Sequence, residues 1–502
     1  MTKKGFLAFA LVFAFSAQLL FSQSVYDSKE LEKHLSYLAS DELGGRYPET
    51  EGSLKASEYL RDIYAKLGLK LLCDSGFQHF QFITGWTSGD SNEAVFNGRK
   101  LQIEKDYVPM DYFQTRLASL DAEVVLIEGY IDQNVCTKLE EHIKNRWVIL
   151  DKRYDYDKSL SRQQSVVMLM RAGAAGVLIV ADTLRPEIDN VYNIPVHKTT
   201  NMGPVVCISR SLADSLEESF KNRDTIVGNM YINRGPVYIG EAYTDSSYAF
   251  IASLHKTISI TTHFTPIYTN AKNVVAYLEG SDPVLKNEII VVGGHYDHLG
   301  TKTRISRKTG EPVTRIYNGA DDNGSGSVGV LELAQKYARS ENRPKRSVIF
   351  VNFDAEELGL IGSSHFFDDT NAINPRNVKA MINLDMIGRY TDEKGLSIIG
   401  TNTSKEMKEM QKLIKKSNKA LKTMDFPQNT FLFFGSDHVN FYKHNIPVMF
   451  FSTNLHPDYH KPTDTPEKIN YQAMSDILQI ADKLLDNLAN RKRNLTFKEL
   501  EF

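Results

Sequence analysis

The 502-residue sequence has few cysteines, no excess of basic charge and no long apolar run beyond its first 23 residues. Fifty-nine Lys and Arg residues against 62 Asp and Glu residues give a net charge of −3, which excludes a basic face for nucleic acid. The three cysteines are too few and too widely spaced for a thiolate zinc ribbon or a disulfide scaffold. They are expected to be buried as apolar side chains, unless two of them form one disulfide.

The N-terminus has the layout of a secretory signal peptide. Two lysines precede an uncharged, largely apolar run over residues 5–22. We predict a signal peptide over residues 1–23, cleaved after Ala17 or near Gln23, and export to the periplasm or the extracellular space. An uncleaved signal anchor is the alternative, because about 20 apolar residues are enough to span a bilayer.

Two different sequence patterns follow the N-terminal segment. Helical periodicity predicts two helices between Ser28 and Leu69, the second with Ser53 as its N-cap and Gly68 as its stop. Short apolar runs and one helix between residues 122 and 212 predict a small α/β unit. This unit contains no cluster of His, Asp and Glu, so we interpret it as an inserted, non-catalytic domain.

The second half of the chain alternates buried strands with longer helices. The predicted strands are residues 289–294, 347–353, 380–384 and 446–452. The predicted helices are residues 325–339, 405–416 and 471–488. This alternation predicts an α/β fold with a mixed, mostly parallel sheet flanked by helices.

Acidic and histidine side chains follow these strands. They are His295, Asp297, His298, Asp321, Asp322, Glu356, Glu357, Asp385 and His460. Because the carboxyl ends of the strands in an open α/β sheet border one crevice, we expect these side chains to converge. Imidazole and carboxylate ligands without thiolate suit zinc or a similar divalent ion, and there are enough carboxylates for two ions.

Residue chemistry suggests further roles. Neighbouring side chains at a strand end point in different directions, so one residue of the pair Glu356 and Glu357 can bind metal while the other acts as general base. Asp297 can accept the second ring N–H of His295 and fix its tautomer. Tyr459, next to the last histidine, can donate a hydrogen bond to the oxyanion of a tetrahedral intermediate.

These motifs together resemble a known family. The sequence resembles the dizinc aminopeptidases and glutamate carboxypeptidases of metallopeptidase family 28. The motifs that carry the resemblance are GGHYDH, GADDNGSG, DAEELGLIGS, NLDMIG, GSDH, YHKPTD and the opening segment YLASDELGGRYPETEGSLKASEYL. The resemblance implies a zinc aminopeptidase-like phosphorylase/hydrolase fold and two Zn²⁺ ions per chain. It implies Asp322 as the ligand that bridges both ions and Glu356 as the base. The remaining ligands that it implies are His295, Glu357, Asp385 and His460.

The resemblance also sets the expected domains and activity. The inserted unit, with AGAAGVLIV, resembles a protease-associated domain, so we predict the insertion at residues 111–244 and the catalytic domain at residues 24–110 and 245–502. The expected activity is that of an exported aminopeptidase acting on peptides. Aminopeptidase action rests on family frequency alone. A carboxypeptidase or dipeptidase, a single-zinc glutaminyl cyclase and a non-catalytic binding protein are the alternatives.

One motif points to another class of protein. Gly324, Gly326 and Gly329 spell G-x-G-x-x-G, the dinucleotide fingerprint, but polar residues precede them where that site requires a strand. Two acids there would also repel a pyrophosphate. We therefore interpret these glycines as small residues that let a helix pack closely. Neither G-x-S-x-G nor H-E-x-x-H occurs in the chain.

Several residues near the motifs receive no chemical role. Packing or loop hydrogen bonds are expected for His298, His365, His438 and His456. The role of Asp437 in GSDH is undecided. An aromatic run before GSDH is expected in the core, with a substrate pocket as the alternative, and its members are Phe431, Phe433 and Phe434.

Overall fold

A computed structural model describes most of the chain. It covers residues 26–500 except 111–115, 130–132, 152–161, 185–201, 219–224, 234–237, 240–241, 244–245, 307–308, 369–372, 418–420 and 425–429. The predicted signal peptide lies outside the described residues. Two compact units are present, Met1–Phe82 with Thr269–Phe502 as the first and Ile83–Tyr268 as the second.

The first unit is built on a mixed sheet whose central strands are parallel. The strand order is β1 (Lys70–Leu71), β13 (Ser246–Leu278), β17 (Ser347–Phe353), β14 (Ile289–His295), β18 (Val378–Leu384), β21 (Val448–Ser452), β19 (Leu396–Ile399) and β20 (Thr423–Met424). Strands β17, β14, β18 and β21 run parallel, whereas β13 and β19 are antiparallel to their inner neighbours. The predicted mixed, mostly parallel sheet is confirmed.

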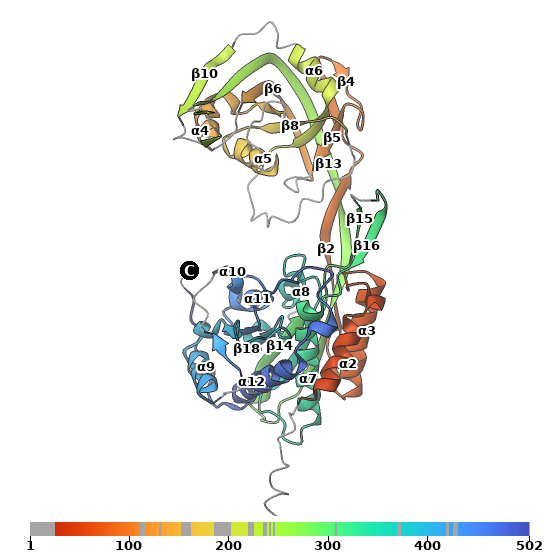
Figure 1. Ribbon diagram of the computed structural model, residues 1–502, viewed down its shortest axis with the longest axis vertical. Helices are drawn as coiled ribbons and strands as arrows, with labels where there is room; N and C mark the ends of the chain where they lie inside the picture. Colours follow the sequence, from red (N-terminus) through yellow and green to blue (C-terminus); the bar gives the residue numbers. More distant parts are fainter. Residues whose placement is uncertain are drawn as a thin grey trace, which may run out of the picture. The chain divides into compact units, whose positions relative to one another are not determined.

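Helices cover both faces of this sheet. All seven residues of β14 are buried, as parallel strands covered on both faces require. Val292 belongs to the core that also contains residues of α2 (Ser28–Leu38), α3 (Glu51–Lys66), α7 (Gly326–Arg339) and α12 (Tyr471–Asn490). Figure 1 shows these four helices beside the sheet. Val291 belongs to the opposite core, which includes the aromatic residues around α8 (Ile361–His365) and α11 (His438–Lys443). The alternation of side chains along each strand thus fills two cores.

The helix predictions agree with the structure except at one cap and in the second unit, where α4 (Gln133–Ile143) was not predicted beside α5 (Arg162–Arg171). Helices α7, α9 (Lys405–Ser417) and α12 occupy the three predicted segments of the second half. Helix α3, however, is capped by Thr50, whose hydroxyl accepts a hydrogen bond from the backbone N–H of Ser53 at 3.3 Å. Ser53 was therefore the wrong N-cap, because it lies inside the first turn.

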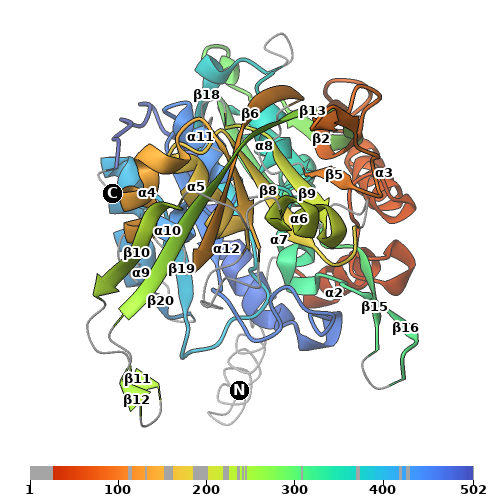
Figure 2. The same ribbon diagram turned by 90° about the horizontal axis from the view of Figure 1, so that it is seen from above.

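The second unit is a smaller α/β sheet. Its parallel strands are β6 (Leu117–Gly129), β7 (Trp147–Leu150), β8 (Gly176–Ala181) and β9 (Val205–Ser209). Helix α6 (Arg210–Glu218) packs on one face, and α4 (Gln133–Ile143) and α5 (Arg162–Arg171) pack on the other (Figure 1 and Figure 2).

This unit is wider than the predicted insertion at residues 111–244. Strands β3 (Glu93–Phe96) and β5 (Tyr107–Met110) precede those bounds, yet they pair with β13 and β9 of the same sheet. The first part of β13 pairs with β6 as well. Cys136 and Cys207 are buried in this unit, whereas Cys73 of the first unit is exposed, so the expectation of three buried cysteines is wrong for Cys73.

Within the described part of the chain, no helix combines the length and apolar character needed to cross a membrane.

Candidate metal centre

The carboxyl ends of three neighbouring strands carry the predicted site. His295 is the last residue of β14 and pairs in register with Phe353, the last residue of β17. Glu356 and Glu357 follow β17 by a short turn, and Asp385 directly follows β18. The parallel register therefore brings residues that are far apart in sequence to one edge of the sheet.

The two carboxylate oxygens of Asp322 face different histidines. Asp322 Oδ1 lies 3.5 Å from His295 Nε2, and Asp322 Oδ2 lies 3.1 Å from His460 Nε2. His295 Nε2 is also 3.6 Å from Asp385 Oδ1, and His460 Nε2 is 3.1 Å from Glu357 Oε2. Two groups of side chains thus share Asp322, each with one further carboxylate and one imidazole.

These distances suit metal ligands. Ligand atoms bound to one tetrahedral zinc at the usual bond lengths lie about 3.3 Å from each other. Asp322 Oδ2 and Asp385 Oδ1 are buried and form no well-aligned hydrogen bond with the described residues, and the nearest nitrogens are His460 Nε2 at 3.1 Å and His295 Nε2 at 3.6 Å. Buried carboxylate oxygens are normally satisfied, so a cation is the missing partner that both atoms fit.

The two adjacent glutamates have opposite electrostatics. Burial raises the pKa of Glu357, but His298 and His460 outweigh it and hold that pKa well below its usual range. Burial raises the pKa of Glu356 well above its usual range, and His295 opposes this only in part. Glu357 is therefore ionised, as a metal ligand must be, whereas Glu356 is the carboxylate of the pair that readily holds a proton.

Asp297 contacts the backbone more than the imidazole. Its Oδ1 accepts a hydrogen bond from the N–H of Glu356 at 3.0 Å, and its Oδ2 accepts one from the N–H of Glu357 at 3.3 Å. His295 Nδ1 lies 3.2 Å from the backbone oxygen of Asp297 and 3.5 Å from Oδ1. The side chain thus joins the end of β14 to the turn that carries both glutamates.

The ring of Tyr459 stacks on the ring of His460. The ring centroids are 3.8 Å apart with an angle of 21° between the planes. Burial raises the pKa of Tyr459, and the carboxylates of Asp322 and Glu357 raise it further. The phenol therefore keeps its proton at neutral pH, as a hydrogen-bond donor must.

His298 takes a position that the sequence analysis missed. It is fully buried, and its Nδ1 lies 2.6 Å from Glu357 Oε1, so packing alone does not describe it. With Asp322 and Glu357 it forms one of the two groups of described side chains that could hold a metal ion, and it shares Glu357 with His460. The signal available in the sequence was the second histidine of GGHYDH, three residues after His295.

Two more polar side chains support the ligands. Ser436 Oγ donates a hydrogen bond of 2.7 Å to Asp385 Oδ2. Asp464 Oδ2 accepts hydrogen bonds from the backbone N–H groups of Asp321 and Asp322, at 2.9 and 3.1 Å. Such outer contacts orient the ligand side chains and tune metal affinity.

Other residues without an assigned role fall into clear environments. His456 Nε2 lies 3.2 Å from Asp321 Oδ2, which makes it a partner of the turn before α7. His438 stacks on Phe450, with centroids 4.7 Å apart, and burial lowers its pKa to about 3. Burial raises the pKa of Asp437 to about 7.

His365 and the aromatic run before GSDH both belong to the first unit. The ring of His365 stacks on Phe80 with centroids 5.0 Å apart. Phe433 is buried in the core, as expected, whereas Phe434 is 44% exposed. The side chain of Phe431 lies outside the described residues.

Close packing explains the glycine motif. A Cβ atom on Gly326 would lie 2.1 Å from the backbone oxygen of Leu384, and one on Gly294 would lie 2.6 Å from the same atom. At Gly326 the start of helix α7 therefore approaches the end of β18 more closely than any other residue would allow, and β14 does the same at Gly294. The glycines serve this approach rather than a pyrophosphate.

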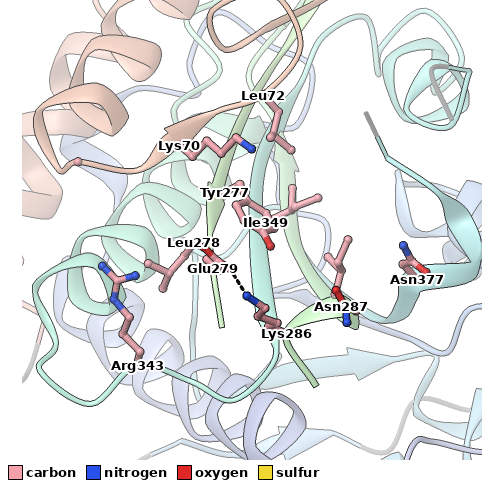
Figure 3. Close-up of a pocket in the computed structure, with 12 residues that line it drawn as sticks. Lys70, Leu72, Tyr277, Leu278, Glu279, Lys286, Asn287, Arg343, Ile349 and Asn377 are labelled. Carbon is pink, nitrogen blue, oxygen red and sulfur yellow. Dashed lines mark hydrogen bonds and ion pairs between the residues drawn. The ribbon is translucent and has the colours of Figure 1, made fainter. Parts of the chain in front are cut away.

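A pocket of about 460 Å³ opens at the other end of the strands (Figure 3). Its lining includes Lys70, Tyr277, Arg343 and the ion pair between Glu279 and Lys286, whose charged atoms are 2.8 Å apart. It borders the amino end of β14, whereas the predicted ligands lie at the carboxyl end. This pocket contains none of the predicted site residues.

The site lies within a segment that matches a known family. Residues 273–485 match peptidase family M28 and contain all the predicted ligands and the predicted base. This segment is an M28 domain. A probable leucine aminopeptidase of Arthroderma otae is 27% identical to the chain over 227 residues, which are 43% of this chain and 57% of that protein. The chain thus spans just over half of that relative.

Two solved structures share the fold. The aminopeptidase from Aneurinibacillus sp. strain AM-1 superposes with a TM-score of 0.52 at 18% identity, covering 95% of this chain and 97% of that chain. BSAP, a zinc aminopeptidase from Bacillus subtilis, superposes with a TM-score of 0.51 at 18% identity, covering 93% and 96%. At this identity the likeness establishes the fold of the M28 domain and its flanking segments.

Proposed function

We propose that this protein is a zinc-dependent aminopeptidase that removes N-terminal residues from peptides. The observation that carries the proposal is the position of Asp322, whose two oxygens face two separate imidazole–carboxylate pairs. Asp322 would bridge two Zn²⁺ ions. His295 and Asp385 would hold one ion, and Glu357 and His460 would hold the other.

The side chains of the site then have separate roles in peptide hydrolysis. When bound, the zinc ions supply Lewis acidity that polarises the substrate carbonyl and eases removal of a proton from the attacking water. Glu356 takes that proton and returns it to the leaving amine as the general base. Tyr459 donates a hydrogen bond to the developing oxyanion, and Asp297 fixes the backbone that carries Glu356.

The names of related proteins support attack at the amino end of the peptide. The Arthroderma relative is named a probable leucine aminopeptidase, and BSAP is named a zinc aminopeptidase. A panel of aminoacyl anilides, tested beside N-blocked and free-carboxylate dipeptides, separates aminopeptidase from carboxypeptidase or dipeptidase action. Hydrolysis of the N-blocked peptides alone would refute aminopeptidase action.

The metal requirement has a direct test. Purified protein is assayed for zinc by elemental analysis, stripped with a chelator, and assayed again after zinc is added back. We expect two zinc ions per chain, loss of hydrolysis on stripping and recovery on addition. Full activity in the metal-free protein would overturn the mechanism.

Export and the identity of the inserted unit complete the proposal. The predicted signal peptide over residues 1–23 supports export to the periplasm or extracellular space. We expect N-terminal sequencing of the mature protein to begin after Ala17 or near Gln23. The second unit, Ile83–Tyr268, lies in the sequence between the two parts of the first unit. It is proposed to be a protease-associated domain, which carries no catalytic side chain.

A further inference from the structure

Arg46 is a fully buried arginine in the segment between α2 and α3, outside the M28 match. Its guanidinium donates hydrogen bonds to four backbone carbonyls. The acceptors and distances are Tyr296 O at 2.6 Å, Leu38 O at 2.5 Å, Asn318 O at 2.6 Å and Gly319 O at 2.9 Å. One side chain therefore joins three segments that are distant in sequence.

Two of these segments carry proposed metal ligands. Tyr296 directly follows His295, and Gly319 directly precedes the turn η3 (Ala320–Ser325), which contains Asp322. This turn is irregular, since Asp322 itself has φ −103° and ψ 97° in place of helical values. Its geometry is therefore set by tertiary hydrogen bonds rather than by a regular helix.

Other contacts strengthen the same junction. Asn318 Nδ2 donates to Ala39 O at 3.0 Å and to Asp41 Oδ1 at 2.7 Å. The backbone N–H of Gly300 donates to Gly45 O at 3.1 Å. A Cβ on Gly45 would lie 2.3 Å from Tyr317 O, so only glycine permits this approach. Residues 39–46 thus pack tightly against the loops after β14 and before η3.

The charge of Arg46 suits this place. Burial lowers its pKa to about 10, while the carboxylates of Asp297, Asp322 and Asp464 favour the charged form. The guanidinium therefore stays charged at neutral pH. Among the described residues no carboxylate forms an ion pair with it, so its short contacts are those to the four carbonyls.

We propose that Arg46 is a positioning residue of the metal centre, which holds the loops of His295 and Asp322 at the separation that metal binding requires. The proposal rests on the zinc site proposed above. Lysine in its place would keep the charge, but a single nitrogen with three donors cannot serve four carbonyls arranged around a planar guanidinium. The Arg46→Lys protein should therefore bind zinc less tightly while keeping the same ligands.

Arg346 provides a matched control. It is 1% exposed, and its guanidinium donates to Leu488 O at 3.1 Å, to Arg491 O at 2.5 Å and to Asn494 Oδ1 at 3.0 Å, and forms an ion pair with Glu288 at 2.8 Å. It precedes β17 directly and so lies at the amino end of the strands, opposite the metal centre. Arg346→Lys thus removes a comparable buried guanidinium without touching the site.

The experiment compares zinc affinity and stability in the full chain. Zinc dissociation constants are measured by competition with a chromophoric chelator, and thermal unfolding is followed by circular dichroism in excess chelator. We expect Arg46→Lys to weaken zinc binding by roughly 10- to 100-fold, the usual effect of losing an outer contact, and Arg346→Lys to leave it unchanged. Both variants should unfold at lower temperature than the parent.

A second variant covers the case in which Arg46→Lys does not fold. Asn318→Ala removes only the side-chain bonds to Ala39 and Asp41, so it should weaken zinc binding in the same direction by a smaller factor. Zinc affinity unchanged in every folded variant at this junction would overturn the role of Arg46. Failure of the parent protein to bind zinc would instead overturn the proposed function, and the positioning role with it.

Discussion

The backbone N–H of Glu356 donates a hydrogen bond of 3.0 Å to the carboxylate of Asp297. Asp297 lies just beyond β14 and Glu356 just beyond β17, so this bond joins the ends of two neighbouring strands. Since the N–H of Glu357 binds the other oxygen of the same carboxylate, the backbone of both glutamates is fixed. The base and the ligand can then point in different directions from one rigid turn.

Glu356→Gln should separate catalysis from metal binding. The amide cannot accept the proton of the attacking water, so turnover of an aminoacyl anilide should fall by roughly 10² to 10⁴-fold. Zinc content should stay at the parent value. Glu357→Gln is the control, because loss of a proposed ligand should lower zinc content itself. Hydrolysis at the parent rate by Glu356→Gln would exclude Glu356 as the base.

Asp297→Asn should lower both stability and activity. The amide offers one acceptor and two donors to a site that contains two N–H donors, so one buried N–H loses its partner. We expect a loss of about 1–3 kcal/mol in the free energy of unfolding, measured with urea. The exposed Asp90→Asn serves as control and should unfold like the parent. Equal stability of the two variants would contradict the role of this carboxylate.

The two zinc ions should respond differently to loss of single carboxylates. Asp322 is shared by both groups of ligands, whereas Asp385 contacts only the group of His295. Asp322→Asn should therefore reduce binding of both ions, and Asp385→Asn should leave about one tightly bound ion per chain, as counted by elemental analysis. Retention of two ions by Asp322→Asn would argue against a bridging role.

Glu332 should make stability depend on pH. Burial in α7 raises its pKa to about 7, with Glu30 adding to the rise and Arg339 opposing it. Because the folded pKa lies above the unfolded value, this group lowers stability as pH rises from about 4.5 through 7. Glu332→Gln should then stabilise the protein at pH 8 by at most about 3 kcal/mol and have no such effect near pH 4.

Urea unfolding at pH 4, 6 and 8 checks this expectation. Glu406 is a control of opposite sign, because a hydrogen bond from Ser404 lowers its pKa to about 2. Glu406→Gln should destabilise the protein at pH 8. A stability difference for Glu332→Gln that is independent of pH would show that its ionisation does not matter for folding.

Much of the fold and of the candidate site could be read from local patterns in the sequence. Strands β14, β17 and β18 are largely apolar runs because both of their faces are covered, and a histidine or an acidic site residue lies at the end of each run or within four residues after it. The carboxyl-end rule then places His295, Asp322, Glu357 and Asp385 at one edge without knowledge of any distance.

The parts that escaped sequence analysis depend on partners far along the chain. Asp464 binds the turn of Asp322 across 142 residues, and Arg46 reaches Gly319 across 273 residues. The residues next to Arg46 in the sequence do not predict that its guanidinium binds four backbone carbonyls. The sequence also did not predict that the ring of His298 lies beside Glu357, because this contact forms only in the folded chain.

By itself the sequence determined the four parallel strands at the centre of the sheet, which residue types gather at its carboxyl edge, and hence the class of metal that suits them. The tertiary structure alone decided how Asp322 divides its oxygens between two histidines, and which buried groups hold it there. The physical reason is one of range. Periodicity and strand ends are properties of neighbouring residues, whereas ligand geometry is fixed by hydrogen bonds between segments that meet only when the chain has folded.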